Sequence, residues 1–145
     1  MRTLAVWTAL AAAMACGLAS AHVTVWPRQS QPGAYEKYVV RVPTEGQVAT
    51  ASVELQVPDD VTIVSVGAPG DFTYEVKRAG ERIVGIVWTR QIKPGEFAEF
   101  AFMARNPKAG GEIRWKAVQR FSDGTSTEWT GPAGDKHPAS VTKIG

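Results

Sequence analysis

The sequence is poor in the side chains from which most protein metal and thiol sites are built. It has one cysteine, Cys16, and two histidines, His22 and His137, among 145 residues. Thiolate clusters for structural zinc or Cu(I) are therefore excluded, and the His-Glu-x-x-His and Gly-x-Ser-x-Gly motifs are absent. The 16 basic and 14 acidic residues are scattered, which argues against a nucleic-acid partner.

Long apolar runs are also scarce, and the one near the start is too short to be a permanent membrane helix, which needs roughly 20 apolar residues. It extends from Leu4 to Ala15, after Arg2 and ahead of the small residues Ala19, Ser20 and Ala21. This is the layout of a cleaved secretory signal. We expect cleavage after Ala21 and a product secreted to the periplasm or another extracytoplasmic compartment. A lipoprotein-type cut before Cys16 is the alternative.

Cleavage after Ala21 would leave 124 residues without a cysteine, enough for one domain held by packing alone. Gly, Pro and Asp recur at short intervals, and the segments between them are rich in β-branched and aromatic residues with period-two alternation. No segment has a helical stripe. The pattern predicts an all-β domain, a single β-sandwich of eight or nine short strands. We place the strands at about residues 22–26, 35–42, 51–57, 62–66, 72–76, 82–89, 97–104, 113–121 and 127–130.

The alternation also predicts which side chains point into the sandwich, because residues two apart share a face. Val53 and Leu55 point inward, which leaves Glu54 on the solvent side. Glu36 has the parity of the apolar residues that follow it, beginning with Tyr38, and so starts on the inward side. A carboxylate there must lie at the rim or find a partner such as a cation. Position alone leaves both interpretations open.

His22 would become the first residue of the mature chain if the signal is cut after Ala21. A free α-amino group and the Nδ1 of the same imidazole can chelate one ion, whereas an internal histidine offers only its ring. Nitrogen and carboxylate donors without thiolates favour Cu(II) among the divalent first-row metals. The amine has an ordinary pKa of about 7.7 to 8.0, so affinity should fall in acid. A terminal histidine can also be incidental, and spacing alone does not decide.

Trp129 belongs to a second site-like stretch, which runs from Thr127 to Pro132. A tryptophan beside a Gly-Pro turn in a sandwich usually packs in the core or at the rim. Its indole can instead lie against a metal and shield it from water. The sequence favours the first interpretation and leaves the second open.

Ordered motifs along the chain resemble those of the bacterial YcnI-like copper-binding domains. They are Ala21 to Val25, Gln31 to Glu36, Arg41 to Pro43, Val57-Pro58, Pro94 to Glu96, Asn106-Pro107, Asp123-Gly124 and Glu128 to Gly131. The resemblance covers essentially all of residues 22–145. It implies a cupredoxin-like or immunoglobulin-like sandwich that binds Cu(II) outside the cytoplasm through a brace with a single histidine.

The resemblance also implies roles for particular residues. His22 would supply its amine and ring nitrogen, Glu36 would be the carboxylate ligand, and Trp129 would lie close to the metal. The protein would be a non-enzymatic metallochaperone of copper homeostasis, with periplasmic copper carriers or membrane copper transporters as partners. Family members often continue into a C-terminal membrane helix, whereas this sequence stops at Gly145 without one, so we expect a freely diffusing periplasmic protein.

Two other functions remain open at this stage. A copper-dependent redox enzyme that begins with histidine would close its brace with a second histidine, and only His137 is available. A metal-free sandwich would bind a protein or sugar through its loops, with His22 incidental. Loss of copper on His137→Ala would favour the enzyme, and indifference to Glu36→Ala would favour the binding module.

Overall fold

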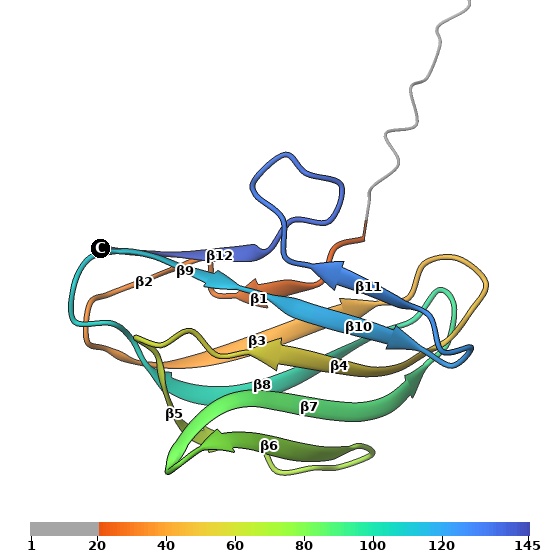
Figure 1. Ribbon diagram of the computed structural model, residues 1–145, viewed down its shortest axis with the longest axis horizontal. Coiled ribbons are helices and arrows are strands. Elements are labelled where there is room, and N and C mark those ends of the chain that lie inside the picture. The colour runs from red at the N-terminus through yellow and green to blue at the C-terminus, as the bar shows by residue number, and fades with distance from the viewer. Residues whose placement is uncertain (1–20) are drawn as a thin grey trace, which may run out of the picture.

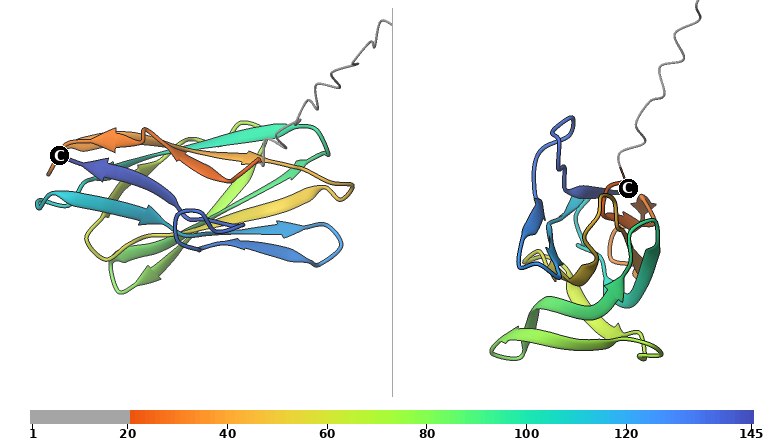
Figure 2. Two further views of the ribbon diagram at one scale, coloured as in Figure 1. Left: turned by 90° about the horizontal axis from the view of Figure 1, so that it is seen from above. Right: turned by 90° about the vertical axis from the view of Figure 1, so that its right-hand side faces the viewer.

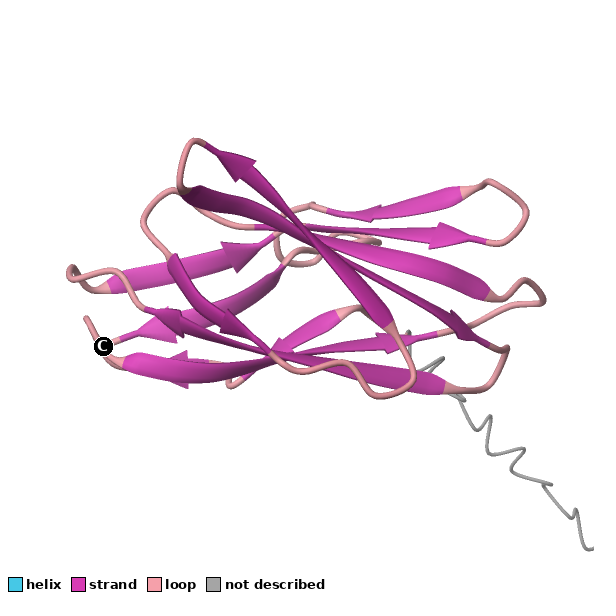
Figure 3. Cartoon of the chain, turned by 90° about the horizontal axis from the view of Figure 1, so that it is seen from below, coloured by secondary structure: helices cyan, strands magenta, loops and turns pink. Residues whose placement is uncertain are grey.

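The computed structural model describes residues 21–145, so the predicted signal lies outside the described residues except for Ala21. These residues form twelve strands and no helix (Figures 1 and 3). Within that range no helix is long and apolar enough to cross a membrane. The strands are β1 (Thr24–Trp26), β2 (Gln29–Ser30), β3 (Tyr35–Pro43), β4 (Thr50–Gln56), β5 (Thr62–Val66), β6 (Thr73–Ala79), β7 (Arg82–Ile92), β8 (Phe97–Arg105), β9 (Gly111–Trp115), β10 (Ala117–Phe121), β11 (Ser126–Trp129) and β12 (Ser140–Ile144).

The strands form a β-sandwich, which confirms the predicted fold class. One sheet has the order β1-β3-β8-β5 and the facing sheet the order β11-β10-β4-β7-β6, and a small third sheet, β2-β12-β9, lies at one end (Figure 2). All pairings between these strands are antiparallel except that of β2 with β12. The third sheet contains both strands that the sequence pattern does not predict.

The segment 113–121, predicted as one strand, is two strands in different sheets. β9 pairs with β12, whereas β10 pairs with β4 and β11. The carbonyl of Lys116, between them, accepts a hydrogen bond from the backbone N–H of Gln56. The inward alternation nevertheless continues across the break, since Ile113, Trp115 and Ala117 are all buried. The alternation of side chains therefore does not reveal that the backbone changes its pairing partner at Lys116.

The core between the two large sheets is built from aromatic rings on β3, β7, β8 and β9. Trp88 stacks on Phe100, and Tyr38 contacts both Phe102 and Trp115. Such pairs contribute about 0.5–1.5 kcal/mol each beyond the burial of their surface. The indole N–H of Trp115 donates to Thr142. Among the described residues, Trp88 Nε1 is the one buried side-chain polar atom without a hydrogen-bond partner.

Glu54 lies on the outer face, as its parity predicts, but it is not open to solvent. Its side chain is 12% exposed because Lys77 and Arg120 cover it, at 2.9 and 3.0 Å from its two carboxylate oxygens. Burial alone would raise the pKa of Glu54, but the hydrogen bonds from Lys77 and Arg120 outweigh burial and lower it. Arg120 belongs to β10, which pairs with β4, and Lys77 belongs to β6, which lies one strand further away, beyond β7.

Candidate metal site at the amino terminus

β1 holds the segment that begins at His22 against β3. Val23 and Val25 are buried in the core, and Val25 lies opposite Val40 of β3. The backbone N–H of Val25 also donates to Ser140 Oγ of β12 at 2.8 Å. His22 therefore lies just before a firmly placed strand and is half-buried at the edge of the sandwich.

Trp129, the last residue of β11, contacts both histidines of the chain. Its ring centroid is 5.4 Å from that of His22, at an interplanar angle of 52°, and 5.0 Å from that of His137, at 80°. His137 lies in the loop between β11 and β12, which folds back over β11 through a hydrogen bond from Gly131 N to the His137 carbonyl. The structure thus brings together His22 and Trp129, which the sequence analysis groups, and adds His137.

Gln119 of β10 fixes the orientation of the Trp129 indole. Its side-chain oxygen accepts the indole N–H at 3.0 Å, and its amide nitrogen donates to the carbonyl of Pro43 and to Thr50 Oγ1, both at 2.8 Å. Gln119 is buried. It is a residue that sequence reasoning missed, although its parity with Ala117 was a signal that it points inward.

Glu45 is an acidic side chain beside the point where the mature chain would begin. Its Oε1 accepts a hydrogen bond from the backbone N–H of Ala21 at 2.7 Å. Glu45, Ala21, Trp129 and His137 line one pocket of about 260 Å³. No sequence signal marks Glu45, because it lies in the loop after β3, where no alternation pattern applies.

The structure does not bring Glu36 to this group. Thr24 lies opposite Arg41, so His22 lies beside the Pro43 end of β3, whereas Glu36 is at the strand's start. Seven residues of strand at 3.3 Å per residue separate the two ends by about 23 Å. The alternation pattern correctly predicts the face of β3 on which Glu36 lies, but it does not predict how far along the strand Glu36 is from His22.

Glu36 instead ends a buried polar network. Ser30 Oγ donates to its carboxylate at 2.6 Å, Asn106 donates to Ser30 Oγ at 2.8 Å, and the hydroxyl of Tyr38 donates to Asn106 Oδ1. Burial is the main cause that raises the pKa of Tyr38 to about 12. Glu36 thus has a hydrogen-bonded partner of its own, as a half-buried carboxylate requires.

Side chains alone do not provide a finished metal site. Among residues 21–145 no three His, Cys, Asp or Glu side chains lie close enough together to hold an ion. In the uncut chain the backbone nitrogen of His22 is part of a peptide bond, so it is not available as a metal ligand. Any chelate at His22 would therefore depend on the amine that cleavage after Ala21 would release.

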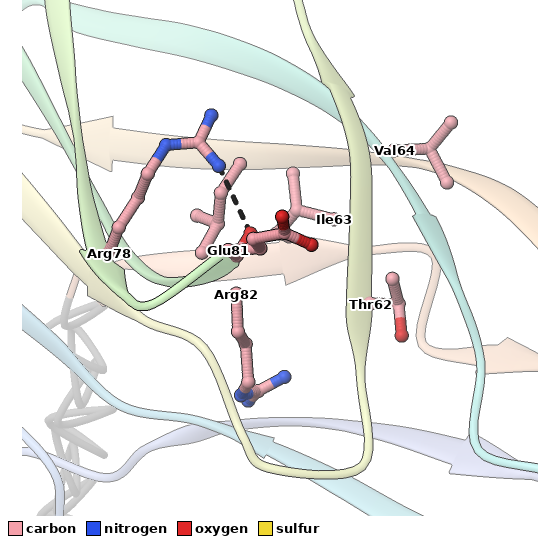
Figure 4. A pocket seen from close by; sticks show the side chains of 7 residues that line it. Thr62, Ile63, Val64, Arg78, Glu81 and Arg82 are labelled. Atoms are coloured by element: carbon pink, nitrogen blue, oxygen red, sulfur yellow. Dashed lines mark hydrogen bonds between the residues drawn. The ribbon is translucent and has the colours of Figure 1, made fainter.

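A larger hollow lies elsewhere, between β5 and the β6–β7 hairpin (Figure 4). Its volume is about 470 Å³, and no histidine lines it. Arg78 donates to the Glu81 carbonyl at 3.1 Å, and Arg82 donates to the carbonyls of Pro58 and Val61 at 2.6 and 3.0 Å. Both guanidinium groups are engaged in holding loop backbone. The greater volume of this hollow therefore does not make it the functional site.

Residues 22–144 match the model of the family described as "Domain of unknown function (DUF1775)". The chain belongs to this family. The DUF1775 match begins at His22, the residue that the predicted signal cleavage would expose.

Known relatives of this DUF1775 chain include a copper-binding protein. "Copper-binding protein CutI" of Bacillus subtilis (strain 168) is 34% identical over 129 residues, which are 87% of this chain and 63% of that protein. The chain thus spans less than two thirds of that relative's length. An uncharacterized protein from Nocardia farcinica with an immunoglobulin-like fold has a TM-score of 0.73 at 26% identity, over 85% of this chain and 97% of that one.

A more distant structural likeness concerns the fold alone. A non-cellulosomal cohesin from Archaeoglobus fulgidus has a TM-score of 0.52 at 11% identity, over 86% of this chain and 90% of that one. At that identity no residue role can be transferred. The likeness agrees with an immunoglobulin-like sandwich.

Proposed function

We propose that the processed protein binds one Cu(II) ion at its amino terminus and carries it as cargo outside the cytoplasm, without catalysing a reaction. The observation that carries this proposal is the contact of His22 with Trp129 at 5.4 Å, at the first residue of the family match. The 34% identity to a copper-binding protein supports the choice of metal. The chain would leave the cytoplasm through the signal at residues 1–21.

The chemistry follows from the donors that cleavage would create. The α-amino group and Nδ1 of His22 would close one chelate ring on the ion, and such nitrogen donors suit Cu(II). Trp129 would cover one side of the ion, since its indole is held by Gln119 and the residue is 7% exposed. An ion with few protein ligands at a half-exposed terminus suits a carrier, whose metal must leave again. Periplasmic copper carriers or membrane copper transporters would be the exchange partners.

One contact favours a second candidate function, a copper-dependent redox enzyme with a two-histidine brace. His137 lies 5.0 Å from the Trp129 ring, on the loop that folds back over β11. On our proposal His137→Ala leaves the stoichiometry and the spectrum of bound Cu(II) unchanged. Loss of the copper in this variant would favour the enzyme.

The test compares two chains that differ only in where they begin. One begins at His22 and the other at Gly17, so that five extra residues move the free amine out of chelating range of the imidazole. We expect one-to-one Cu(II) binding with a nitrogen-ligand electron paramagnetic resonance spectrum for the first, and a lost or altered spectrum for the second. Identical weak binding by both would refute the proposal.

A further inference from the structure

The outer face of the sheet β1-β3-β8-β5 combines positive charge with exposed apolar side chains. Tyr38, Val40 and Phe100 point into the core, so the residues that alternate with them on β3 and β8 point outward. Arg28, which follows β1, joins this face because its guanidinium lies over the Trp26 ring. We define the basic-aromatic face by eight of these outward residues: Trp26, Arg28, Tyr35, Lys37, Arg41, Phe97, Met103 and Arg105.

We infer that the basic-aromatic face docks on a lipid surface that carries anionic headgroups. Such a surface has two layers that the face could meet, a plane of negative headgroups and the hydrocarbon beneath it. The inference goes beyond the proposed function, because it involves no copper. It rests on the charge of the face, on its exposed apolar side chains and on the way in which the two are paired.

The charge of the basic-aromatic face is one-sided. Its cations are Arg28, Lys37, Arg41 and Arg105, whereas the outward residues of β1, β3, β5 and β8 include a single carboxylate, Glu99, which bonds Arg41 at 3.2 Å. The outer face of the other large sheet is nearly balanced, with Glu54, Glu75, Glu128, Lys77 and Arg120. Residues 22–145 as a whole hold 15 basic and 14 acidic residues, since Arg2 is the only charged residue before His22. The positive excess is therefore a property of this face, and each cation near an anionic membrane strengthens binding about fivefold.

Exposed apolar side chains gather on the same face. Six large hydrophobic residues are exposed among residues 21–145, and four of them belong to it: Trp26, Tyr35, Phe97 and Met103. Met103 lies opposite Lys37 in the register of β3 and β8, and both line a hollow of about 200 Å³. Apolar surface of this kind is unfavourable in water, and contact with hydrocarbon would remove that cost.

Two aromatic rings of the face carry guanidinium groups. Arg28 Cζ lies 4.6 Å and Arg41 Cζ 5.3 Å from the Trp26 ring centroid. Arg105 Cζ lies 5.6 Å from the centroid of Tyr35. Tryptophan and tyrosine are enriched where headgroups meet hydrocarbon, and arginine keeps its charge in water while its stem covers apolar surface. Tyr35 and Arg41 are six residues apart on β3, about 20 Å, so a flat lipid surface could meet both clusters at once.

An acidic protein is the alternative partner for these cations. Its carboxylates would satisfy the guanidinium groups, but Trp26, Phe97 and Met103 would each need a matching pocket in that protein. A lipid surface needs no matching shape, because its headgroups and acyl chains rearrange around the side chains. Apolar residues placed between cations therefore favour lipid.

The test measures flotation of the copper-free chain that begins at His22 with lipid vesicles. We expect binding to vesicles of phosphatidylglycerol mixed with phosphatidylcholine, weak binding to phosphatidylcholine alone, and a loss of affinity as the salt concentration rises. Replacing both Lys37 and Arg105 with glutamine should weaken binding about 25-fold, which is about fivefold for each charge.

The matched control replaces both Lys93 and Lys116 with glutamine. These lysines are exposed and lie outside the basic-aromatic face, so their loss changes the net charge equally but should weaken binding far less. All four substituted side chains are exposed, so neither variant should unfold the domain, and thermal melts check this. Equal losses of affinity in the two double variants would overturn the inference.

Trp26 provides a second readout. It is 38% exposed, whereas the other tryptophans of residues 21–145 are buried: Trp88, Trp115 and Trp129. Its emission should shift to shorter wavelength on anionic vesicles and be quenched by brominated acyl chains, and Trp26→Phe should abolish both effects. Binding without these changes would overturn the inference, as would no binding to anionic vesicles.

Two further results separate this inference from the other possibilities. Capture of the chain by polyglutamate, without binding to vesicles, would overturn the lipid inference and assign the face to an acidic protein. The vesicle experiments contain no Cu(II), so their failure leaves the proposed copper function standing. Failure of the Cu(II) titration likewise leaves the lipid inference standing.

Discussion

Replacing Gln119 with leucine should destabilise the domain strongly, although the side chain keeps a similar volume. The variant loses three buried hydrogen bonds, to the Trp129 indole, the Pro43 carbonyl and Thr50. At 0.5–1.5 kcal/mol each, the loss is about 1.5–4.5 kcal/mol, and the unpaired indole N–H and Pro43 carbonyl favour the upper part of that range. This is a large share of the 5–15 kcal/mol typical of a domain.

Urea unfolding measures this loss as a lower midpoint at an unchanged m value. The matched control is Gln56→Leu, an exposed glutamine on β4, for which we expect a change within about 0.5 kcal/mol. Equal urea midpoints for the two variants would refute the conclusion that Gln119 connects Trp129 to Pro43, the last residue of β3. The same variant should also perturb the Cu(II) spectrum, because the indole beside His22 would lose its anchor.

Two further predictions concern the core and the charged surface. Trp115→Phe should cost about 1 kcal/mol more than Trp88→Phe in thermal melts, because Trp115 loses its bond to Thr142 whereas Trp88 loses an unpaired N–H; the opposite order would contradict the hydrogen-bond assignment. Glu54→Gln should be less stable than the wild type at neutral pH, and the gap should close as pH falls. The sign follows from the lowered pKa of Glu54, whose contribution is present above the unfolded value of about 4.3 and is lost as pH falls through the folded value. A gap that is constant from pH 7 to pH 3 would show that the carboxylate charge is not the cause.

The sequence predicted most strands because alternation is a local property that each segment carries by itself. The nine predicted segments, with the one at 113–121 split in two, correspond to ten of the strands found among residues 21–145. β12 pairs with β2 and with β9, which come from distant parts of the chain, so no local pattern marks β2 or β12. The break at Lys116 is equally invisible, since the parity of the side chains continues across it.

The candidate site could be predicted only where a motif marks a residue directly. His22 is marked by its place after the signal and Trp129 by its Gly-Pro neighbour, and the structure places them in contact. The parity of Glu36 describes the face on which it lies, whereas its distance from His22 depends on the register of β1 on β3. Glu45 becomes a neighbour of the amino terminus only through the tertiary contact with Ala21.

The two ends of the described chain lie well apart along the long axis of the sandwich (Figure 1). Gly145 N donates to the Ser30 carbonyl, and Ser30 is the residue that bonds Glu36, at the end of β3 remote from His22. A protein attached to a bead or sensor surface through Gly145 would therefore keep its amino terminus away from the point of attachment. Immobilised in this way, the domain would have the proposed copper site accessible to a soluble donor or acceptor, and metal exchange between the two could be followed in real time.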